Sequence, residues 1–245
     1  MSYEIDKNSI LKQVSAPLSI EVLDEVFSTN DYIKDKDLFC VIAKEQSRGK
    51  GTNNRSFFSK KGGIYLSVKL SLNLLGDDFL LLTPFVAVKT ARAIEKVAGV
   101  KVQIKWVNDI YLNGKKLGGI LLENKVSNGV SEVVIGIGLN VEKQAFPPLL
   151  LNCPISLEEV VQKVDKNRLI AEFLNGFIGF EEEFKSREFL REYDDRFYLK
   201  NKDITLNRNG EIIKGKALGI DKKARLVVQT QNGVETFVVG DVKII

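Results

Sequence analysis

The sequence predicts a mixed α/β (α+β) protein, in which a mixed, largely antiparallel sheet with flanking helices is followed by a small β-barrel. Apolar runs with the period-two alternation of strands recur along the chain and are interrupted by two stretches with helical periodicity. Asn-Gly dipeptides, which suit tight hairpin turns, join several of these strands. Five short alternating segments fill residues 201–245, as expected of a small barrel. We therefore predict a main domain at 1–199 and a β-domain at 200–245.

The first elements are two strands around a short helix. The segment LSIEVLDEVF at 18–27 is predicted as a strand and is followed by a capped turn, STN, at 28–30. A short helix is expected from Asp31, and LFCVIAKEQ at 38–46 is the next predicted strand. After a basic loop, IYLSVKLSL at 64–72 alternates with period two, which indicates a strand with one covered face.

Two helical segments are predicted further along the chain. Thr83 and Pro84 form an N-cap and first-turn pair, and Gly99 ends the pattern. Between them, apolar residues follow one another at helical spacing, at Ala87, Ala91, Ile94 and Ala98. Ser156 and Glu159 form a capping box before the second segment. There a phenylalanine stripe, interpreted as a buried helix face, recurs at Phe173, Phe177, Phe180 and Phe184.

Three strands are predicted between the helical segments. VQIKWVNDIYLNG at 102–114 and KKLGGILLENK at 115–125 are joined by the turn Asn113-Gly114. SEVVIGIGLNV at 131–141 follows a second Asn-Gly at 128–129. Hairpins of this kind predict antiparallel neighbours.

Composition excludes several classes of protein. At 245 residues, 44% hydrophobic and 28% charged, the chain is expected to be globular. Its longest apolar runs, such as FLLLTPFVAV at 79–88, are shorter than the ~20 residues of a membrane span, and Met1 precedes polar sequence rather than a signal peptide. We therefore expect a cytoplasmic protein without membrane association. Cys40 and Cys153 are far apart and are interpreted as small buried residues.

The types of charged residue restrict the chemistry. Histidine is absent, which excludes Ser-His-Asp and Cys-His catalysis and nearly all transition-metal sites. Catalysis must use Lys, Arg, Asp, Asn and backbone groups, and no metal site made of side chains is predicted. The net charge of +4 comes from residues 200–245, which hold nine Lys or Arg against five Asp or Glu. A basic tail permits nucleic-acid contact, although a solvated surface is the simpler explanation.

A basic, glycine-rich loop at 47–63 is the first candidate site. It holds five cations, four glycines and no acid. Glycines at 49 and 51 let backbone N–H groups approach an anion, and Lys50 and Arg55 supply positive charge. The pattern GKGTNN departs from a dinucleotide-binding motif at Asn54, and a strand follows it. The residues alone indicate an anion-binding loop without naming the anion.

The segment KWVNDIYLNGKKLGG at 105–119 is the second candidate. On one continuous strand Lys105 and Asp109 would share a face, so a cation and a carboxylate would lie close together. Lys116 follows the hairpin turn, where Gly119 would allow a ligand to approach the backbone. A surface Lys–Asp pair of little energetic weight would explain the same residues.

The segment GIGLN at 136–140 is the third candidate. Glycine weakens a strand, so Gly136 and Gly138 indicate either a bulge or a flat ligand lying on the backbone. Asn140 could read the edge of a base or cap the next turn.

Taken in order, these motifs resemble those of the biotin protein ligase family. The matching segments are STN at 28–30, EQSRGKGTNNRSFFS at 45–59, GGIYLS at 62–67, KWVNDIYLNGKKLGGIL at 105–121 and IGIGLN at 135–140. The segments GIDKKARLVV at 219–228 and VVGDVKI at 238–244 resemble that family's SH3-like end domain. The resemblance implies a ligase that converts biotin and ATP, with Mg²⁺, into biotinyl-5′-AMP and pyrophosphate. A lysine of a biotin carboxyl carrier protein or biotinyl domain then takes the biotinyl group.

The resemblance also implies roles for individual residues. The expected catalytic residues are Lys116, Asp109, Arg55 and Lys50. The expected biotin-binding residues are Ser28, Thr29, Asn30, Gln46, Gly49, Lys50, Thr52, Lys116, Gly119, Gly136 and Gly138. The expected ATP- or adenylate-binding residues are Arg55, Phe57, Lys105, Asn108, Lys116 and Asn140. Fixed cations suit this reaction, because a carboxylate must approach a polyphosphate.

Three departures from the family pattern accompany the resemblance. Thr52 stands where many members carry an arginine that helps to retain the adenylate, and this leaves the tightness of retention open. Val107 replaces a usual proline, and Phe57 replaces a frequent tryptophan.

The same residues also bear on the alternatives to a monofunctional biotin ligase. About twenty residues precede the first predicted strand, too few for a helix-turn-helix, so DNA binding is not expected. The sequence lacks the histidine-containing signature of lipoate-type ligases. Lys116 argues against a non-catalytic biotin-binding module. The alternative of a biotin-responsive nucleic-acid-binding protein is supported by the basic tail alone. A homodimer is left open, because the strand at 131–138 could pair with its copy as an edge strand.

Overall fold

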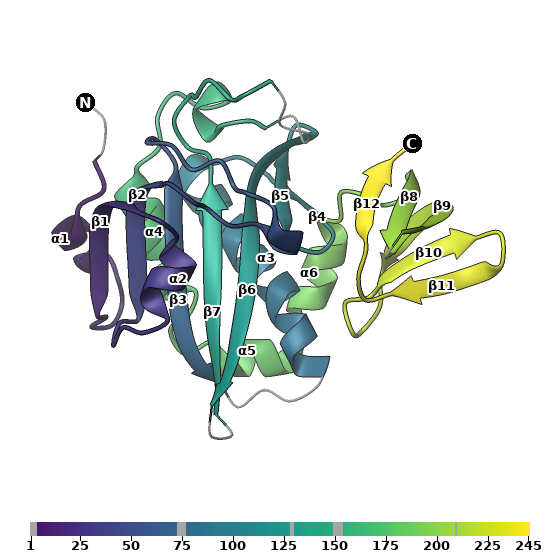
Figure 1. Cartoon of the computed structure of the whole chain (residues 1–245), viewed down its shortest axis with the longest axis horizontal. Coiled ribbons are helices and arrows are strands. Elements are labelled where there is room, and N and C mark those ends of the chain that lie inside the picture. Colours follow the sequence, from purple (N-terminus) through teal and green to yellow (C-terminus); the bar gives the residue numbers. More distant parts are fainter. Residues whose placement is uncertain (1–3, 73–76, 128–129, 149–153, 209) are drawn as a thin grey trace.

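The computed structural model describes residues 4–72, 77–127, 130–148, 154–208 and 210–245. A large sheet carries helices on both faces, and the C-terminal residues form a second, smaller sheet at one end of the molecule (Figure 1). The predicted fold class, mixed α/β with an appended β-domain, is confirmed.

The large sheet has seven strands in the order β1-β2-β3-β7-β6-β5-β4. They are β1 (Ile20–Val26), β2 (Cys40–Gln46), β3 (Ile64–Leu72), β4 (Gln103–Lys105), β5 (Asp109–Leu112), β6 (Lys115–Ser127) and β7 (Val130–Leu139). The pair β1–β2 is parallel, and the other neighbouring pairs are antiparallel. Asn113 and Gly114 both have positive φ, 50° and 75°, which confirms the predicted tight turn. The second predicted turn, at 128–129, lies outside the described residues.

The position of β7 corrects one prediction. β7 pairs with β3 on one side and with β6 on the other along its whole length, so it is an inner strand of the sheet. Its backbone groups are already paired, and it cannot add a copy of itself edge to edge. The predicted edge-strand route to a homodimer is therefore wrong.

Helices cover both faces of the large sheet. They are α1 (Lys7–Leu11), α2 (Thr29–Ile33), α3 (Asp77–Ala98), α4 (Lys166–Asn175), α5 (Glu181–Ser186) and α6 (Phe189–Asp195), with single 3₁₀ turns η1 (Thr52–Asn54) and η2 (Leu157–Glu159). The main core lies between the sheet and helices such as α3, while the short α2 packs on the opposite face, where Ile33 contacts Val41 and Val134 (Figure 1). This arrangement sets the start of α2 above β3 and β7.

The start of α3 differs from the prediction. Within the described residues the helix spans Asp77–Ala98, and Pro84 lies inside it rather than in its first turn. Leu81 and Leu82, which precede the proline, are 4% and 0% exposed. Burying two leucines contributes about 3–6 kcal/mol, which offsets the roughly 3 kcal/mol cost of an interior proline.

The phenylalanine stripe belongs to two helices instead of one. Phe173 lies in α4 and Phe184 in α5, while Phe177 and Phe180 lie in the connection between them. All four are at most 5% exposed, so their predicted burial is confirmed although the single helix is wrong. The predicted capping box is present, with the Ser156 N–H donating to the Glu159 carboxylate at 2.8 Å, but it caps only the turn η2.

The strand predicted at 102–114 is also divided. β4 ends at Lys105, and the chain turns back so that β5 begins at Asp109 and pairs antiparallel with β4. Trp106 is buried in the turn, and its indole N–H donates to the Ala224 carbonyl at 3.0 Å. Lys105 and Asp109 are therefore cross-strand partners and not residues of one strand.

The C-terminal sheet has five antiparallel strands in the order β11-β10-β9-β8-β12, as predicted in number. They are β8 (Asp203–Arg208), β9 (Glu211–Ile220), β10 (Leu226–Thr230), β11 (Gly233–Phe237) and β12 (Asp241–Ile244). Its buried residues, among them Leu206 and Phe237, belong to the same continuous core as the large sheet. The boundary at 199/200 stays a prediction.

Candidate functional site

A pocket opens where the start of α2, the basic loop and strands β6 and β7 meet. Side chains from all three sequence motifs reach it. Its lining consists of Ser28, Thr29, Asn30, Gln46, Lys50, Gly51, Thr52, Phe57, Leu66, Asn108, Asp109, Lys116, Gly119, Ile120, Leu121, Gly136, Ile137 and Gly138. The fold thus brings together most of the residues that the sequence singled out.

The start of α2 forms a polar wall. Ser28 is the N-cap in an extended conformation and Thr29 begins the helix, two residues earlier than predicted. Ser28, Thr29 and Asn30 are at most 4% exposed, so their polar atoms need partners inside the protein. The Asn30 Nδ2 donates to Glu123 at 2.8 Å, and the Ser67 hydroxyl lies 2.6 Å from Asn30 Oδ1.

Gln46 holds this wall against the basic loop. Its Oε1 accepts from the backbone N–H of Thr29 at 2.8 Å, and the Thr29 hydroxyl lies 3.1 Å from the same oxygen. Its Nε2 donates to the Ser59 hydroxyl at 3.0 Å. The amide of Gln46 is therefore fixed in one orientation at the edge of the pocket.

The glycines of β7 make room for protein side chains. A Cβ on Gly136 would lie 2.3 Å from Asn30 Oδ1, and one on Gly138 would lie 2.6 Å from Cε1 of Phe57. The pairing of β7 with β3 and β6 runs without interruption, so the predicted bulge in this strand is wrong. Asn30 and Phe57 lie directly over the strand and shape the pocket floor.

A bulge is found instead in the neighbouring hairpin. Lys116 and Gly119 are three residues apart, so on a regular strand they would face opposite sides of the sheet. The register shifts between Ile110 and Tyr111, so that Tyr111 pairs with Lys116 while Asp109 pairs with Gly119. The extra residue returns Lys116 to the pocket face. Its ammonium lies 2.6 Å from Asp109 Oδ1, and 20% of the side chain is exposed.

Two further predicted cations are paired with carboxylates, as Lys116 is. Lys50 Nζ lies 2.6 Å from Asp31 Oδ2, beside the pocket. Arg55 Nη2 lies 2.7 Å from Asp241 Oδ2, which ties the basic loop to the C-terminal sheet. Each of these cations is held in place by a carboxylate, which also neutralises part of its charge.

Asn108 and Lys105 differ in their access to the pocket. Asn108 lines it and donates from Nδ2 to the Ile120 carbonyl at 2.8 Å. Lys105 lies outside the lining, with Nζ 5.6 Å from the centroid of the Tyr111 ring. Burial lowers the pKa of Lys105, although the charge of Asp109 acts in the opposite direction.

Four predicted site residues lie outside the pocket lining in the part of the chain that the structure describes: Gly49, Arg55, Lys105 and Asn140. A Cβ on Gly49 would meet the Ser59 hydroxyl at 2.4 Å, so this glycine permits loop packing. Asn140 is 4% exposed and donates from Nδ2 to the Ile155 carbonyl at 3.2 Å. The structure gives Asn140 a contact between chain segments instead of a place on the pocket wall.

The sequence interpretation missed the apolar lining and the outer supports of the site. The additional lining residues are Gly51, Leu66, Ile120, Leu121 and Ile137. Ser67 and Glu123 support Asn30 from behind. Ser67 is a buried polar residue in an apolar strand, and that was the available signal for its role.

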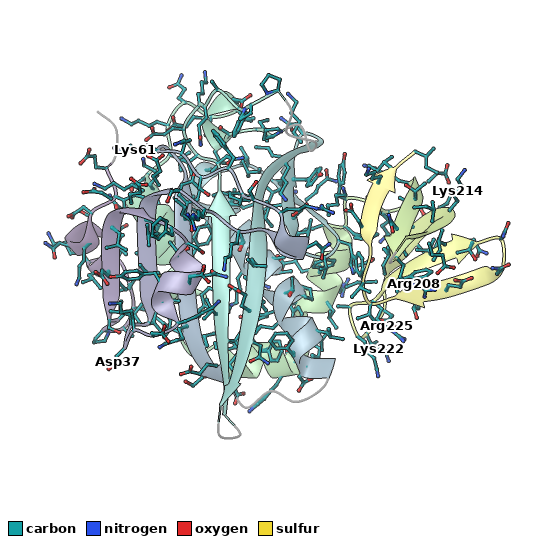
Figure 2. The ribbon with its side chains drawn as sticks, viewed as in Figure 1. Asp37, Lys61, Arg208, Lys214, Lys222 and Arg225 are labelled. Carbon is teal, nitrogen blue, oxygen red and sulfur yellow. The ribbon has the colours of Figure 1, made fainter. Side chains whose placement is uncertain are left out.

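The basic excess of the C-terminal residues lies on the smaller sheet. Figure 2 labels four of its cations, Arg208, Lys214, Lys222 and Arg225. Arg208 lies 2.7 Å from Glu211, and Arg225 lies 2.6 Å from Asp221. Two of these four cations are therefore paired with neighbouring acids.

Other predicted features concern metals, membranes and thiols. Among the described residues, no group of three or more His, Cys, Asp or Glu could hold a metal ion. In those same ranges, no helix is long and apolar enough to cross a membrane. Cys40 is fully buried, as predicted, and burial raises the pKa of its thiol. Cys153 lies outside the described residues.

Two family models match the sequence. The model of the biotin/lipoate A/B protein ligase family matches residues 24–140, and that of the biotin protein ligase C terminal domain matches residues 201–244. These matches contain all three motifs and the C-terminal sheet.

Characterised relatives are similar over much of the chain. The bifunctional ligase/repressor BirA of Bacillus spizizenii is 33% identical over 215 residues, which cover 83% of this chain and 65% of that protein. The biotin–[acetyl-CoA-carboxylase] ligase of Paracoccus denitrificans is 33% identical over 121 residues, covering 44% of this chain and 50% of that protein. The chain thus spans slightly less than two thirds of the BirA relative.

Solved structures share the fold. The biotin protein ligase from Aquifex aeolicus in complex with biotin and ATP superposes with a TM-score of 0.78 at 23% identity, covering 93% of this chain and 98% of that one. The Leishmania major biotin protein ligase in complex with biotinyl-5-AMP has a TM-score of 0.61 at 22% identity, covering 91% and 99%.

Proposed function

The chain belongs to the biotin protein ligase family, and from this membership we propose that it is an ATP-dependent ligase that attaches biotin to a lysine of an acceptor protein. One observation carries the proposal above all others. A lysine, Lys116, is turned by a β-bulge onto the face of a glycine-lined pocket and is held there by Asp109. The reactants would be biotin and ATP, and the first products biotinyl-5′-AMP and pyrophosphate.

The pocket lining supports biotin as the ligand. The urea-like ring of biotin needs donors and acceptors, which Thr29, Asn30 and Gln46 can offer from one wall. The sulfur-containing ring and aliphatic chain need apolar contact, which Phe57 and Leu121 can offer, because these side chains lie on the face of the sheet that carries Gly136 and Gly138. The carboxylate of biotin would then lie toward Lys116.

In the first step, a carboxylate oxygen of biotin would form a bond to the α-phosphorus of ATP. The bond from that phosphorus to the bridging oxygen of pyrophosphate would break. Two anions must approach each other, so a preorganised ammonium at the reacting oxygens is expected to contribute roughly 10²–10³-fold to the rate. We assign this role to Lys116, with Lys50 and Arg55 as supporting cations of the loop. Phe57, Lys105, Asn108 and Asn140 remain the expected contacts of ATP or adenylate.

Mg²⁺ would accompany ATP, held by phosphate oxygens, and would neutralise part of their charge. Asp109 of the pocket lining and Asp31 beside the pocket already contact lysines, so the side chains fit a phosphate-bound ion better than a protein-bound one. Thr52 lines the pocket where an arginine is common in the family, and we expect weaker retention of the adenylate.

In the second step, the acceptor amine would attack the carbonyl carbon of biotinyl-AMP, form an amide and release AMP. A free lysine has a pKa of about 10.4 and must lose a proton first. We assign to Asp109, which lines the pocket, the role of orienting or deprotonating that amine. The acceptor is expected to be the biotinyl domain of a carboxylase, in line with the name of the Paracoccus relative, biotin–[acetyl-CoA-carboxylase] ligase.

The remaining properties stay proposals. We infer a cytoplasmic location, where ATP is available and a buried thiol such as Cys40 stays reduced. The BirA relative is a ligase and repressor, and we propose only the ligase activity here. Retention of this protein on DNA with a strong salt dependence would instead support the nucleic-acid alternative. The oligomeric state is left for measurement.

Pyrophosphate release tests the proposed function. The protein should release pyrophosphate from ATP when biotin is added and should not when lipoate replaces biotin. Release without biotin, or with lipoate only, would contradict the proposal.

A further inference from the structure

Glu123 lies on β6 just outside the pocket, two residues beyond Leu121 of the lining. Its two carboxylate oxygens have different partners. Oε2 accepts from the Asn30 Nδ2 at 2.8 Å, and Oε1 accepts from the Lys34 ammonium at 3.0 Å. The carboxylate therefore joins a polar residue of the pocket to a cation at the end of α2.

The partner of Asn30 decides which way its amide faces. The two ends of an asparagine amide are nearly equal in shape, so packing alone does not select an orientation. An ionised carboxylate can only accept hydrogen bonds, and it therefore turns the NH₂ group of Asn30 toward itself. The carbonyl oxygen is left over Gly136, where a Cβ would lie only 2.3 Å from it. Gly136 is part of the pocket lining.

Lys34 keeps the carboxylate in place. Burial alone would lower the pKa of Lys34, but hydrogen bonds to Glu123 and Asp31 outweigh burial and raise it. Asp31 accepts from Lys34 at 3.1 Å and from Lys50 at 2.7 Å, so the same network continues to the basic loop. Glu123 is thus held from the side opposite to Asn30.

We propose that Glu123 is a positioning residue of this pocket: it holds the Asn30 amide so that the carbonyl oxygen accepts a hydrogen bond from an N–H group of the ligand. The inference rests on the proposed function, in which the ligand is biotin and the N–H belongs to its urea-like ring. Glu123 acts through Asn30 and is not a catalytic residue. Its loss leaves a 4%-exposed NH₂ group without its acceptor. The remaining 2.6 Å contact of Oδ1 is with the Ser67 hydroxyl, which can donate or accept and therefore does not select one orientation of the amide.

Calorimetric titration with biotin tests this role. Glu123→Ala should weaken biotin binding about tenfold, the scale of one unsatisfied buried group. Glu123→Asp keeps the charge but shortens the side chain by one methylene, so the carboxylate no longer reaches Asn30. This variant should also have a lower affinity for biotin. Glu132→Ala is the matched control, because Glu132 borders the same surface cavity as Glu123. This variant should bind biotin with the affinity of the wild-type protein.

Two further readouts separate positioning from a general loss of structure. In an Asn30→Ala background, Glu123→Ala should cause little additional loss, because the residue through which it acts is gone. In steady-state adenylation, Glu123→Ala should raise the KM for biotin and leave kcat and the KM for ATP near the wild-type values.

The outcomes distinguish this inference from the proposed function. Wild-type affinity in both Glu123→Ala and Glu123→Asp, or full additivity with Asn30→Ala, would overturn the positioning role while the ligase proposal stands. Absence of biotin binding by the wild-type protein would overturn the proposed function itself.

Discussion

Gly136→Ala places a methyl group where the Asn30 amide lies. The new Cβ would be 2.3 Å from Oδ1, 3.0 Å from Cγ and 3.1 Å from Nδ2 of Asn30. Contacts this short do not persist, so the amide must move off β7. It then loses its 2.6 Å contact with Ser67 and its 2.8 Å hydrogen bond to Glu123. Both partners are held by the sheet and cannot follow.

The expected size follows from these two contacts. Biotin binding should weaken about tenfold, because the displaced amide can no longer accept a hydrogen bond from the ligand. Loss of the two intramolecular contacts, at about 1 kcal/mol each, should lower the free energy of unfolding by about 2 kcal/mol. The same loss should lower the unfolding midpoint by about 4–8 °C for a chain of this size. Calorimetric titration with biotin measures the first quantity, and thermal unfolding measures the second.

Asn30→Ala supplies the control for Gly136→Ala. With the amide removed, the added methyl group finds space, and Gly136→Ala should lower the unfolding midpoint little further. An unchanged affinity and midpoint in the single variant, or an equal loss with and without Asn30, would refute the steric argument.

Four other variants test three separate parts of the structure. Lys116→Ala should reduce pyrophosphate release by roughly 10²-fold or more with the fold intact, as expected for loss of one preorganised charge-stabilising group; near-normal turnover would show that the reacting centre is elsewhere. Arg55→Ala should raise the KM for ATP, whereas Asp241→Ala should not, and because both side chains are about half exposed their pair should contribute at most about 1 kcal/mol to stability. Lys105 has a pKa lowered by burial from 10.5, so the unfolded chain holds this proton more tightly than the folded protein, and protonated Lys105 opposes folding at neutral pH. Lys105→Met should therefore have a higher free energy of unfolding than the wild type in denaturant titrations at pH 7. This difference should shrink as the pH rises toward 10.5. A difference that stays constant with pH would contradict the lowered pKa of Lys105.

The elements predicted well are those that local sequence determines. β3 at Ile64–Leu72 agrees with its predicted bounds, because alternation with one covered face leaves little choice of register. The Asn113-Gly114 turn was predictable for a similar reason, since both residues tolerate positive φ. The start of α3 was not, because the gain from burying Leu81 and Leu82 exists only after the helix packs on the sheet.

Most residues of the pocket were predicted from the sequence, but their arrangement in space was not. The sequence motifs named Lys116 and Gly136, yet the bulge that turns Lys116 toward the pocket depends on the pairing of β5 with β6. Likewise, Trp106 in the turn between β4 and β5 donates to the carbonyl of Ala224, which is 118 residues away in the connection between β9 and β10. Glu123 could not be found from the sequence, because its partner Asn30 is 93 residues away.

A crystal structure of the protein with biotin and ATP tests the central claim most directly. We expect the urea-like ring over Gly136 beside Asn30, and the biotin carboxylate or the α-phosphate in contact with the Lys116 ammonium. A structure in which these ligands bind elsewhere, or in which Lys116 contacts neither of them, would contradict the assignment of this pocket as the active site.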